Sequence, residues 1–82
     1  MIYEVQFKPR VMRDLADLPL ILRRRTMEKI ENMQTDLRGD VKRLTNYSPE
    51  YRLRVGDYRV LFEIEDAAII VYRVRHRREA YR

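Results

Sequence analysis

The sequence contains no cysteine, no tryptophan and a single histidine, His76. Without cysteine the chain can form neither a disulfide nor a thiolate metal site, which is typical of proteins in a reducing compartment. The longest uninterrupted apolar run, residues 67–72, is far shorter than the roughly 20 residues that a membrane-spanning helix needs. The first ten residues carry Glu4 and alternate like a strand, which a signal peptide does not. We therefore expect a cytoplasmic protein with no membrane partner.

The chain is short and contains only two glycines and three prolines, with no internal repeat and no linker. Its 82 residues are fewer than the roughly 100–150 of a typical domain. An apolar content of 45 % suffices for a core, even though 38 % of the residues are charged. We predict a single domain that spans residues 1–82.

Positive charge is plentiful and is carried mainly by arginine. The sequence has 15 arginines against three lysines, and its net charge is +5. Residues 72–82 hold five arginines and one glutamate, so they account for +4 of this charge. Because a guanidinium pairs with two oxygens at once, concentrated arginine favours phosphate recognition, and a generic basic surface is the alternative. The run Arg23, Arg24 and Arg25 predicts a solvated helix face, with an RNA contact as its alternative.

The N-terminal half predicts one strand followed by two helices. Residues 2–7 alternate between apolar and polar side chains, as in a half-buried strand. Residues 9–18 have apolar side chains every three or four positions and begin with a proline, which suits a first helical turn. Residues 19–37 continue this spacing up to Gly39, a typical stop signal. We expect these two helices to form an antiparallel hairpin joined at Pro19.

The C-terminal half predicts strands. Residues 51–55 and 58–65 flank the dipeptide Gly56-Asp57, which is typical of a two-residue hairpin turn. Residues 69–75 are rich in β-branched side chains and predict a further strand, and residues 42–47 are a weak strand candidate. The order β-α-α-β-β-β, with this possible extra short strand, indicates an α+β fold. We expect the N-terminal strand and the helical hairpin to pack on one face of a small antiparallel sheet.

The hairpin register separates an apolar face from a basic one. A two-residue turn places Val55 opposite Tyr58 and Arg54 opposite Arg59. Two arginines that face each other repel, so this arrangement costs stability and indicates a functional role. The face turned to the core would carry Tyr51, Leu53, Val55, Tyr58, Val60, Phe62 and Ile64. The opposite face would carry Arg52, Arg54 and Arg59, with Leu61, Glu63 and Glu65 further along.

The register of the last strand decides where its two arginines lie. One parity buries Arg73 and Arg75 without partners, which is energetically prohibitive. The other parity sends Ile70, Tyr72 and Val74 to the core, and this is the parity we predict. The open sheet face would then bind anions through Arg52, Arg54, Arg59, Arg73 and Arg75, and a surface network in which the charges screen one another is the alternative.

Two groups near the C-terminus could act in acid–base chemistry. His76 is the only histidine, so a two-histidine ribonuclease site is excluded, and a solvated residue is the alternative to an acid or base. The phenol of Tyr81 is a weak base at neutral pH, but neighbouring guanidiniums would stabilise its phenolate. Packing of the Tyr81 ring against the sheet is the alternative, and aromatic rings here could also stack on exposed bases.

Residues 51–82 combine a basic strand, a G-D-Y-R turn, an alternating strand and the ending H-R-R-E-A-Y. This combination resembles the C-terminal half of the RelE family of toxins from bacterial and archaeal toxin–antitoxin modules. Members of this family also begin with a strand and a helical hairpin. The resemblance implies a ribosome-dependent endoribonuclease that cleaves mRNA in the A site and leaves a 2′,3′-cyclic phosphate. It also implies a cognate antitoxin of the RelB type as partner.

The resemblance assigns roles by position. Tyr81 corresponds to the general base for the 2′-hydroxyl and Arg59 to the group that stabilises the phosphate in the transition state. Arg75 corresponds to the proton donor for the 5′-oxygen, and Arg77 is the alternative if the alignment shifts. Arg52 and Arg54 stand at positions where the family often has lysines that contact phosphate. With the sheet-face argument, the predicted phosphate-binding residues are Arg52, Arg54, Arg73 and Arg77. No metal or organic cofactor is implied, because positioned guanidiniums can supply the charge stabilisation that a metal otherwise provides.

Two other classes of protein stay open at this point. A toxin of the related ParE type shares the fold and poisons DNA gyrase by binding, without catalysis. The joint presence of Arg59, Arg75 and Tyr81 favours the RelE type over this alternative. A basic nucleic-acid-binding module would bind in a strongly salt-dependent manner and would tolerate the loss of one phenolic hydroxyl.

Overall fold

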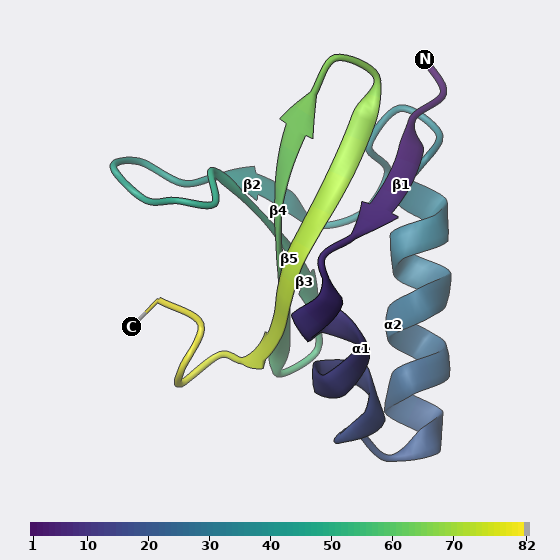
Figure 1. Ribbon diagram of the computed structural model, residues 1–82, viewed down its shortest axis with the longest axis vertical. Helices are drawn as coiled ribbons and strands as arrows, with labels where there is room; N and C mark the ends of the chain where they lie inside the picture. Colours follow the sequence, from purple (N-terminus) through teal and green to yellow (C-terminus); the bar gives the residue numbers. More distant parts are fainter. Residues whose placement is uncertain (82) are drawn as a thin grey trace.

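The structure, a computed structural model, describes residues 1–81 as two helices packed against one face of a five-stranded sheet (Figure 1). The sheet order is β1-β5-β4-β3-β2; β1 runs parallel to β5, and the other neighbours are antiparallel. The predicted α+β fold with an extra short strand is confirmed, and the parallel β1 makes the sheet mixed. No helix within residues 1–81 is long and apolar enough to cross a membrane. The elements are β1 (Glu4–Phe7), α1 (Pro9–Ala16), α2 (Leu20–Met33), β2 (Val41–Arg43), β3 (Tyr51–Val55), β4 (Tyr58–Glu65) and β5 (Ala68–His76).

The element boundaries follow the local sequence signals closely in the hairpin and less closely before it. Strands β3 and β4 have the predicted bounds, and Val55 faces Tyr58 as expected. Helix α2 ends at Met33, four residues before the predicted end. The backbone reverses there because Asp36 and Leu37 adopt φ values of 55° and 54°, which no helix accommodates.

The hydrophobic core lies between the helices and the inner face of the sheet. Helix α1 contributes Val11 and Leu15, and α2 contributes Ile30 and Met33. All of these side chains are buried, as the three-to-four spacing of the apolar residues predicts. The sheet contributes the buried residues Leu53, Val55, Val60, Phe62, Ile69, Val71 and Val74.

A β-bulge corrects the predicted parity of β5. Strict alternation would send Ile70, Tyr72 and Val74 to the core, but only Val74 belongs to the core cluster. Leu61 faces Arg73 whereas Phe62 faces Val71, so one extra residue, Tyr72, lies between the two pairs. The bulge shifts the side-chain alternation by one position and lets residues on both sides of it reach the core. Ile69 and Val71 take the places predicted for Ile70 and Tyr72.

Arg23 fastens the turn between the two helices. Its Nε donates a hydrogen bond to the carbonyl oxygen of Leu15 at 2.9 Å. Its Nη2 donates to the carbonyl oxygens of Ala16 and Leu18, both at 3.1 Å. The last carbonyls of a helix lack partners within the helix, so the guanidinium satisfies two such acceptors of α1, at Leu15 and Ala16, and a third carbonyl in the turn, at Leu18. The first residue of the arginine run is therefore structural, while Arg24 and Arg25 are exposed.

We expect Arg23→Ala to lower the free energy of unfolding by about 2 kcal/mol, because hydrogen bonds from a charged donor contribute roughly 1.5–3 kcal/mol. Urea unfolding followed by circular dichroism measures this difference. The matched control is Arg24→Ala, which removes an exposed arginine on the same helix and should change stability by less than about 0.5 kcal/mol. Equal effects of the two substitutions would contradict the role assigned to Arg23.

Candidate functional site

The outer face of the sheet is turned away from the helices. On this face, side chains of like charge stand opposite each other on neighbouring strands. Arg54 faces Arg59 across β3 and β4, as the hairpin register predicts, and Arg59 in turn faces Arg75 across β4 and β5. Lys42 faces Arg52 across β2 and β3. Like charges in directly opposed positions destabilise a sheet. Three such pairs side by side indicate that this face has been kept basic for binding rather than for stability.

Four of these cations line a cleft of about 400 Å³ on the outer face: Lys42, Arg52, Arg54 and Arg59. Two tyrosines, Tyr47 and Tyr81, also line it, and none of its described lining residues is acidic. We call this feature the basic cleft. Its lining residues are Lys42, Leu44, Thr45, Tyr47, Arg52, Arg54, Arg59 and Tyr81.

The cations of the basic cleft differ in how firmly they are held. The Nη1 of Arg52 donates to the carbonyl oxygen of Asp40 at 2.7 Å and to its Oδ1 at 3.1 Å, and the Arg52 side chain is only 15 % exposed. The Nη1 of Arg59 donates to two carbonyl oxygens of the hairpin turn, at Gly56 and Tyr58, each at 2.9 Å. The carbonyl contacts orient the guanidinium of Arg59 without neutralising it, whereas Arg52 also forms an ion pair with the Asp40 carboxylate. Within residues 1–81, Arg54 has no carboxylate partner.

The positive charge of the basic cleft affects the carboxylate of Asp40, which pairs with Arg52. The hydrogen bond from Arg52 lowers the pKa of Asp40 below its usual value, and the charges of Arg52, Arg54 and Arg59 act in the same direction. A carboxylate is favoured in its ionised form by nearby cations. A phosphate group is expected to respond to the same three guanidiniums.

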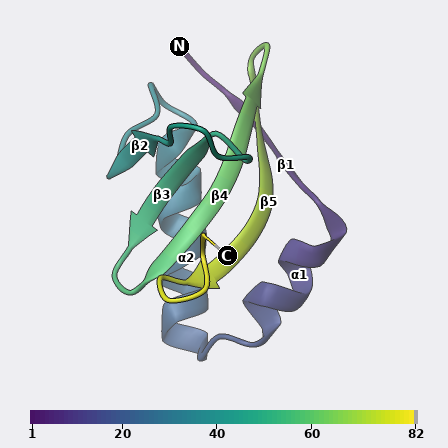
Figure 2. The ribbon, with the colours of Figure 1, turned by 90° about the vertical axis from the view of Figure 1, so that its left-hand side faces the viewer.

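The C-terminal tail, residues 77–81, crosses the outer face of the sheet, on the side away from the helices (Figures 1 and 2). Ala80 is buried, and so is Leu61, which alternates with the core residues Val60 and Phe62 and therefore points to the outer face. Tyr81 follows Ala80, lines the basic cleft and is 44 % exposed. The phenol that the sequence singled out thus lies among the cations of β2, β3 and β4.

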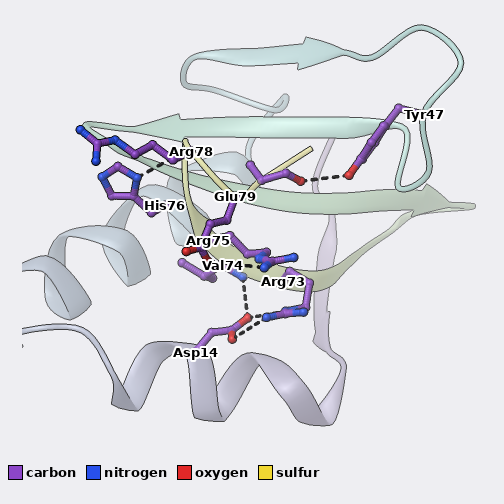
Figure 3. Close-up of polar contacts among 9 residues, drawn as sticks. Asp14, Tyr47, Arg73, Val74, Arg75, His76, Arg78 and Glu79 are labelled. Carbon is purple, nitrogen blue, oxygen red and sulfur yellow. Dashed lines mark hydrogen bonds and ion pairs between the residues drawn. The ribbon is translucent and has the colours of Figure 1, made fainter. Parts of the chain in front are cut away.

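Tyr47 fixes the end of the tail. Its hydroxyl donates a hydrogen bond to the carbonyl oxygen of Ala80 at 3.0 Å (Figure 3). Its ring meets the ring of Tyr81 edge to face, with the centroids 5.5 Å apart and the planes at 90°. Aromatic pairs prefer this geometry because the positive edge of one ring meets the negative face of the other.

The predicted proton donors and His76 lie beside the basic cleft, at the end of β5. Arg75 pairs with Glu79 of the tail at 3.5 Å, and the Nε of Arg77 lies 3.9 Å from Asp57 of the hairpin turn. His76 packs edge to face on Tyr58, and its Nδ1 accepts a hydrogen bond from the backbone of Arg78 (Figure 3). In this arrangement His76 stabilises the turn that leads into the tail.

Arg73 lies apart from the other predicted phosphate ligands. Its Nε and Nη2 donate to the two carboxylate oxygens of Asp14 in α1, at 2.9 and 3.2 Å (Figure 3). The hydrogen bonds and the charge of Asp14 raise the pKa of Arg73 above its already high value. Arg73 keeps the predicted parity of Arg75 and faces Leu61, two positions from the Arg59–Arg75 pair. Its guanidinium nevertheless pairs with Asp14 and does not line the basic cleft, so a phosphate contact of Arg73 stays a prediction.

The sequence does not predict the roles of three functional or supporting residues. Lys42 belongs to a weak strand candidate whose partner strand the sequence does not specify, and its pairing with Arg52 in the structure puts it on the basic face. Tyr47 and Asp14 act through contacts across 33 and 59 residues, for which the local sequence carries no signal.

Comparisons with known proteins show the family to which the chain belongs. Residues 5–81 match the family model described as the ParE toxin of the type II toxin–antitoxin system parDE. The toxin RelE3 of Methanocaldococcus jannaschii is 36 % identical over 83 residues, which cover 95 % of this chain and 94 % of that protein. This chain belongs to the RelE/ParE family of type II toxins. The resemblance to RelE toxins is thereby confirmed.

Solved structures of RelE proteins share the fold of this chain. A RelB–RelE antitoxin–toxin complex from Methanococcus jannaschii contains a chain with a TM-score of 0.75 and 34 % identity, with 89 % of this chain and 91 % of that chain covered. An archaeal RelE–RelB complex from Pyrococcus horikoshii contains a chain with a TM-score of 0.78 and 28 % identity, with 98 % and 100 % covered. The RelE/ParE fold therefore extends over nearly the whole of this chain.

Proposed function

We propose that this RelE/ParE family member is a ribosome-dependent endoribonuclease that cleaves mRNA in the A site and thereby inhibits translation. The observation that carries the proposal is the position of the Tyr81 phenol in a cleft whose described charged lining residues are all cationic. Phosphodiester cleavage by a 2′-hydroxyl needs a base, charge stabilisation at phosphorus and a proton donor for the leaving oxygen. The basic cleft and the groups beside it offer a candidate for each.

In the proposed reaction, Tyr81 acts in its phenolate form: its oxygen accepts the proton of the 2′-hydroxyl and becomes the phenol as the 2′-oxygen attacks phosphorus. Arg59 and Arg54 stabilise the charge on the phosphate oxygens while the bond to the 5′-oxygen breaks. The 5′-oxygen leaves with a proton, so the products are a 2′,3′-cyclic phosphate and a free 5′-hydroxyl. We assign this proton to Arg75, with Arg77 as the alternative, because a departing alkoxide is a stronger base than a neutral guanidine.

The openness of the basic cleft supports a requirement for the ribosome. Tyr81 is 44 % exposed, and the cleft lies on a sheet face rather than between two domains. Such a surface can contact a phosphate but cannot by itself hold a flexible RNA strand in an in-line geometry. Orientation of the reacting groups contributes a large share of catalysis. A ribosome that holds the mRNA codon in the A site would supply this orientation.

A RelB-like antitoxin is the proposed protein partner. The solved relatives from Methanococcus jannaschii and Pyrococcus horikoshii are complexes of RelE with RelB. This chain is basic, with a net charge of +5, so an acidic and partly apolar antitoxin segment would complement it. We expect such an antitoxin to suppress cleavage by covering the basic cleft or displacing the tail.

Primer extension on a defined mRNA tests the proposed activity directly. The purified protein is added to the mRNA alone and to the same mRNA on ribosomes with an open A site. We expect cuts at the A-site codon only with ribosomes, and fragments that end in a 2′,3′-cyclic phosphate. Absence of cleavage by the folded protein in both reactions would refute the proposal.

We expect Arg59→Ala to reduce the rate of this cleavage by about 100-fold or more, because one donor to a developing oxyanion contributes roughly 10²–10³-fold. The matched control is Arg38→Ala, which removes an exposed arginine between α2 and β2, outside the basic cleft. Cleavage that is equally impaired in both variants would indicate a general charge effect instead of a defined role for Arg59.

The same experiment separates the two other classes of function. The match to a family model described for ParE makes DNA gyrase the target to test next. Inhibition of gyrase supercoiling without any RNA cleavage would favour the ParE type. Salt-dependent RNA binding without cleavage or gyrase inhibition would favour a nucleic-acid-binding module.

A further inference from the structure

The loop between β2 and β3, residues 44–50, is closed at its base and carries Tyr47 near its tip. The backbone N–H of Leu44 donates to the carbonyl oxygen of Glu50 at 2.6 Å. The N–H of Glu50 donates to a carboxylate oxygen of Glu63 in β4 at 2.7 Å. The loop is thus anchored to the central strand β4, and its half-buried tyrosine contacts the tail.

The contacts of Tyr47 with the tail are specific. Its single hydroxyl proton is directed to the carbonyl oxygen of Ala80, the residue immediately before Tyr81. Its ring restrains the Tyr81 ring from the side, edge to face. One side chain therefore restrains both the backbone before Tyr81 and the Tyr81 ring, and it lines the same cleft.

We propose that Tyr47 is a positioning residue that holds the Tyr81 phenol in the basic cleft. This inference rests on the proposed function, in which Tyr81 is the base. Tyr81 lies in the C-terminal tail, beyond the last strand, and rotation of the backbone around Ala80 would carry its side chain out of the basic cleft. Two restraints from an anchored loop remove this freedom before the substrate arrives, which is how preorganisation raises a catalytic rate.

Two substitutions separate the two contacts. Tyr47→Phe keeps the ring and removes only the hydrogen bond to Ala80, and Tyr47→Ala removes both contacts. We expect kcat for A-site cleavage to fall by about fivefold in Tyr47→Phe. The loss of one hydrogen bond should lower the population of molecules with Tyr81 held in the basic cleft by about this factor. We expect a fall of about 100-fold in Tyr47→Ala, as for a misplaced reacting group. KM for the programmed ribosome should stay within about twofold in both variants, since ground-state binding is retained.

A double-mutant cycle with Tyr81→Phe distinguishes positioning from a general loss of stability. If Tyr47 acts only through the Tyr81 hydroxyl, Tyr47→Phe should cause no further loss in the residual activity of the Tyr81→Phe variant. The matched control is Tyr72→Phe, which removes a phenolic hydroxyl on β5 outside the basic cleft and should leave kcat unchanged. Multiplicative losses in the double variant would overturn the proposal.

The ring protons of Tyr81 give a readout that is independent of activity. Edge-to-face packing should shift their NMR resonances in the wild type, and the shift should disappear in Tyr47→Ala. Unshifted wild-type resonances, wild-type kcat in both Tyr47 variants, or an effect confined to KM would each overturn the role of Tyr47 while the cleavage proposal stands. Absence of cleavage by the wild type overturns the proposed function first, and the catalytic role of Tyr47 with it.

Discussion

Substitution of Tyr81 by phenylalanine should reduce the rate of ribosome-dependent cleavage by about 100-fold or more, since general base catalysis contributes typically 10²–10⁴-fold. The substitution removes one oxygen and keeps the ring, so the edge-to-face contact with Tyr47 and the burial of Ala80 should persist. The loss should appear in kcat, because the phenol acts on the 2′-hydroxyl only during reaction. Single-turnover cleavage of a programmed ribosome complex, followed by primer extension, measures this rate.

The control for this prediction is again Tyr72→Phe. The ring of Tyr72 lies 5.3 Å beneath the ammonium group of Lys8, outside the basic cleft. The Tyr72→Phe variant reports any non-specific effect of losing a phenolic hydroxyl, and its cleavage rate should equal that of the wild type. Wild-type cleavage by Tyr81→Phe together with strong impairment of Arg59→Ala would keep the ribonuclease and remove Tyr81 as its base.

Substitution of Asp14 by alanine should lower the free energy of unfolding by about 3 kcal/mol, because removal of one partner of a largely buried ion pair costs roughly 3–5 kcal/mol. The Asp14 side chain is only 9 % exposed, and the Arg73 side chain is 28 % exposed, which places the effect at the lower end of this range. Asp14 also accepts the backbone N–H of Val74 at 2.9 Å. Three hydrogen bonds therefore end on one carboxylate.

The position of Asp14 explains why the cost is high. Strand β1 pairs with β5 only from Ala68 to Val71. Beyond Val71, the edge of β5 on the β1 side lacks a strand partner. Asp14 takes over this role by accepting the Val74 N–H from α1. Without it, a buried donor and a partly desolvated guanidinium both lose their acceptor.

Urea unfolding followed by circular dichroism measures the effect, with Asp17→Ala as the matched control. Asp17 is an exposed carboxylate at the C-terminal end of the same helix, where negative charge is unfavourable. Its removal should leave stability unchanged or raise it slightly. A free energy of unfolding for Asp14→Ala within about 0.5 kcal/mol of the wild type would show that Arg73 finds adequate solvation without its partner.

Local signals in the sequence determined the elements and one of the two critical registers. The alternation of β3 and β4 and the Gly56-Asp57 turn were sufficient to pair Arg54 with Arg59, because a two-residue hairpin permits only one register. The same alternation assigned Leu53 and Val60 to the core, where they are fully buried. The concentration of arginine in the C-terminal half likewise predicted a basic sheet face.

Tertiary structure decided the rest, since it depends on contacts between residues far apart in the chain. Strict alternation along β5 cannot send Ile69, Val71 and Val74 to the same face, because residue 74 differs in parity from residues 69 and 71. The bulge at Tyr72 shifts the alternation by one position, and all three side chains reach the core. Asp14 draws Arg73 out of the expected row of phosphate ligands through a contact across 59 residues. The place of Tyr81 in the basic cleft depends on the burial of Ala80 and on Tyr47, 33 residues before Ala80. A periodic pattern specifies which face a side chain takes within one element, but only packing between elements specifies what that side chain meets.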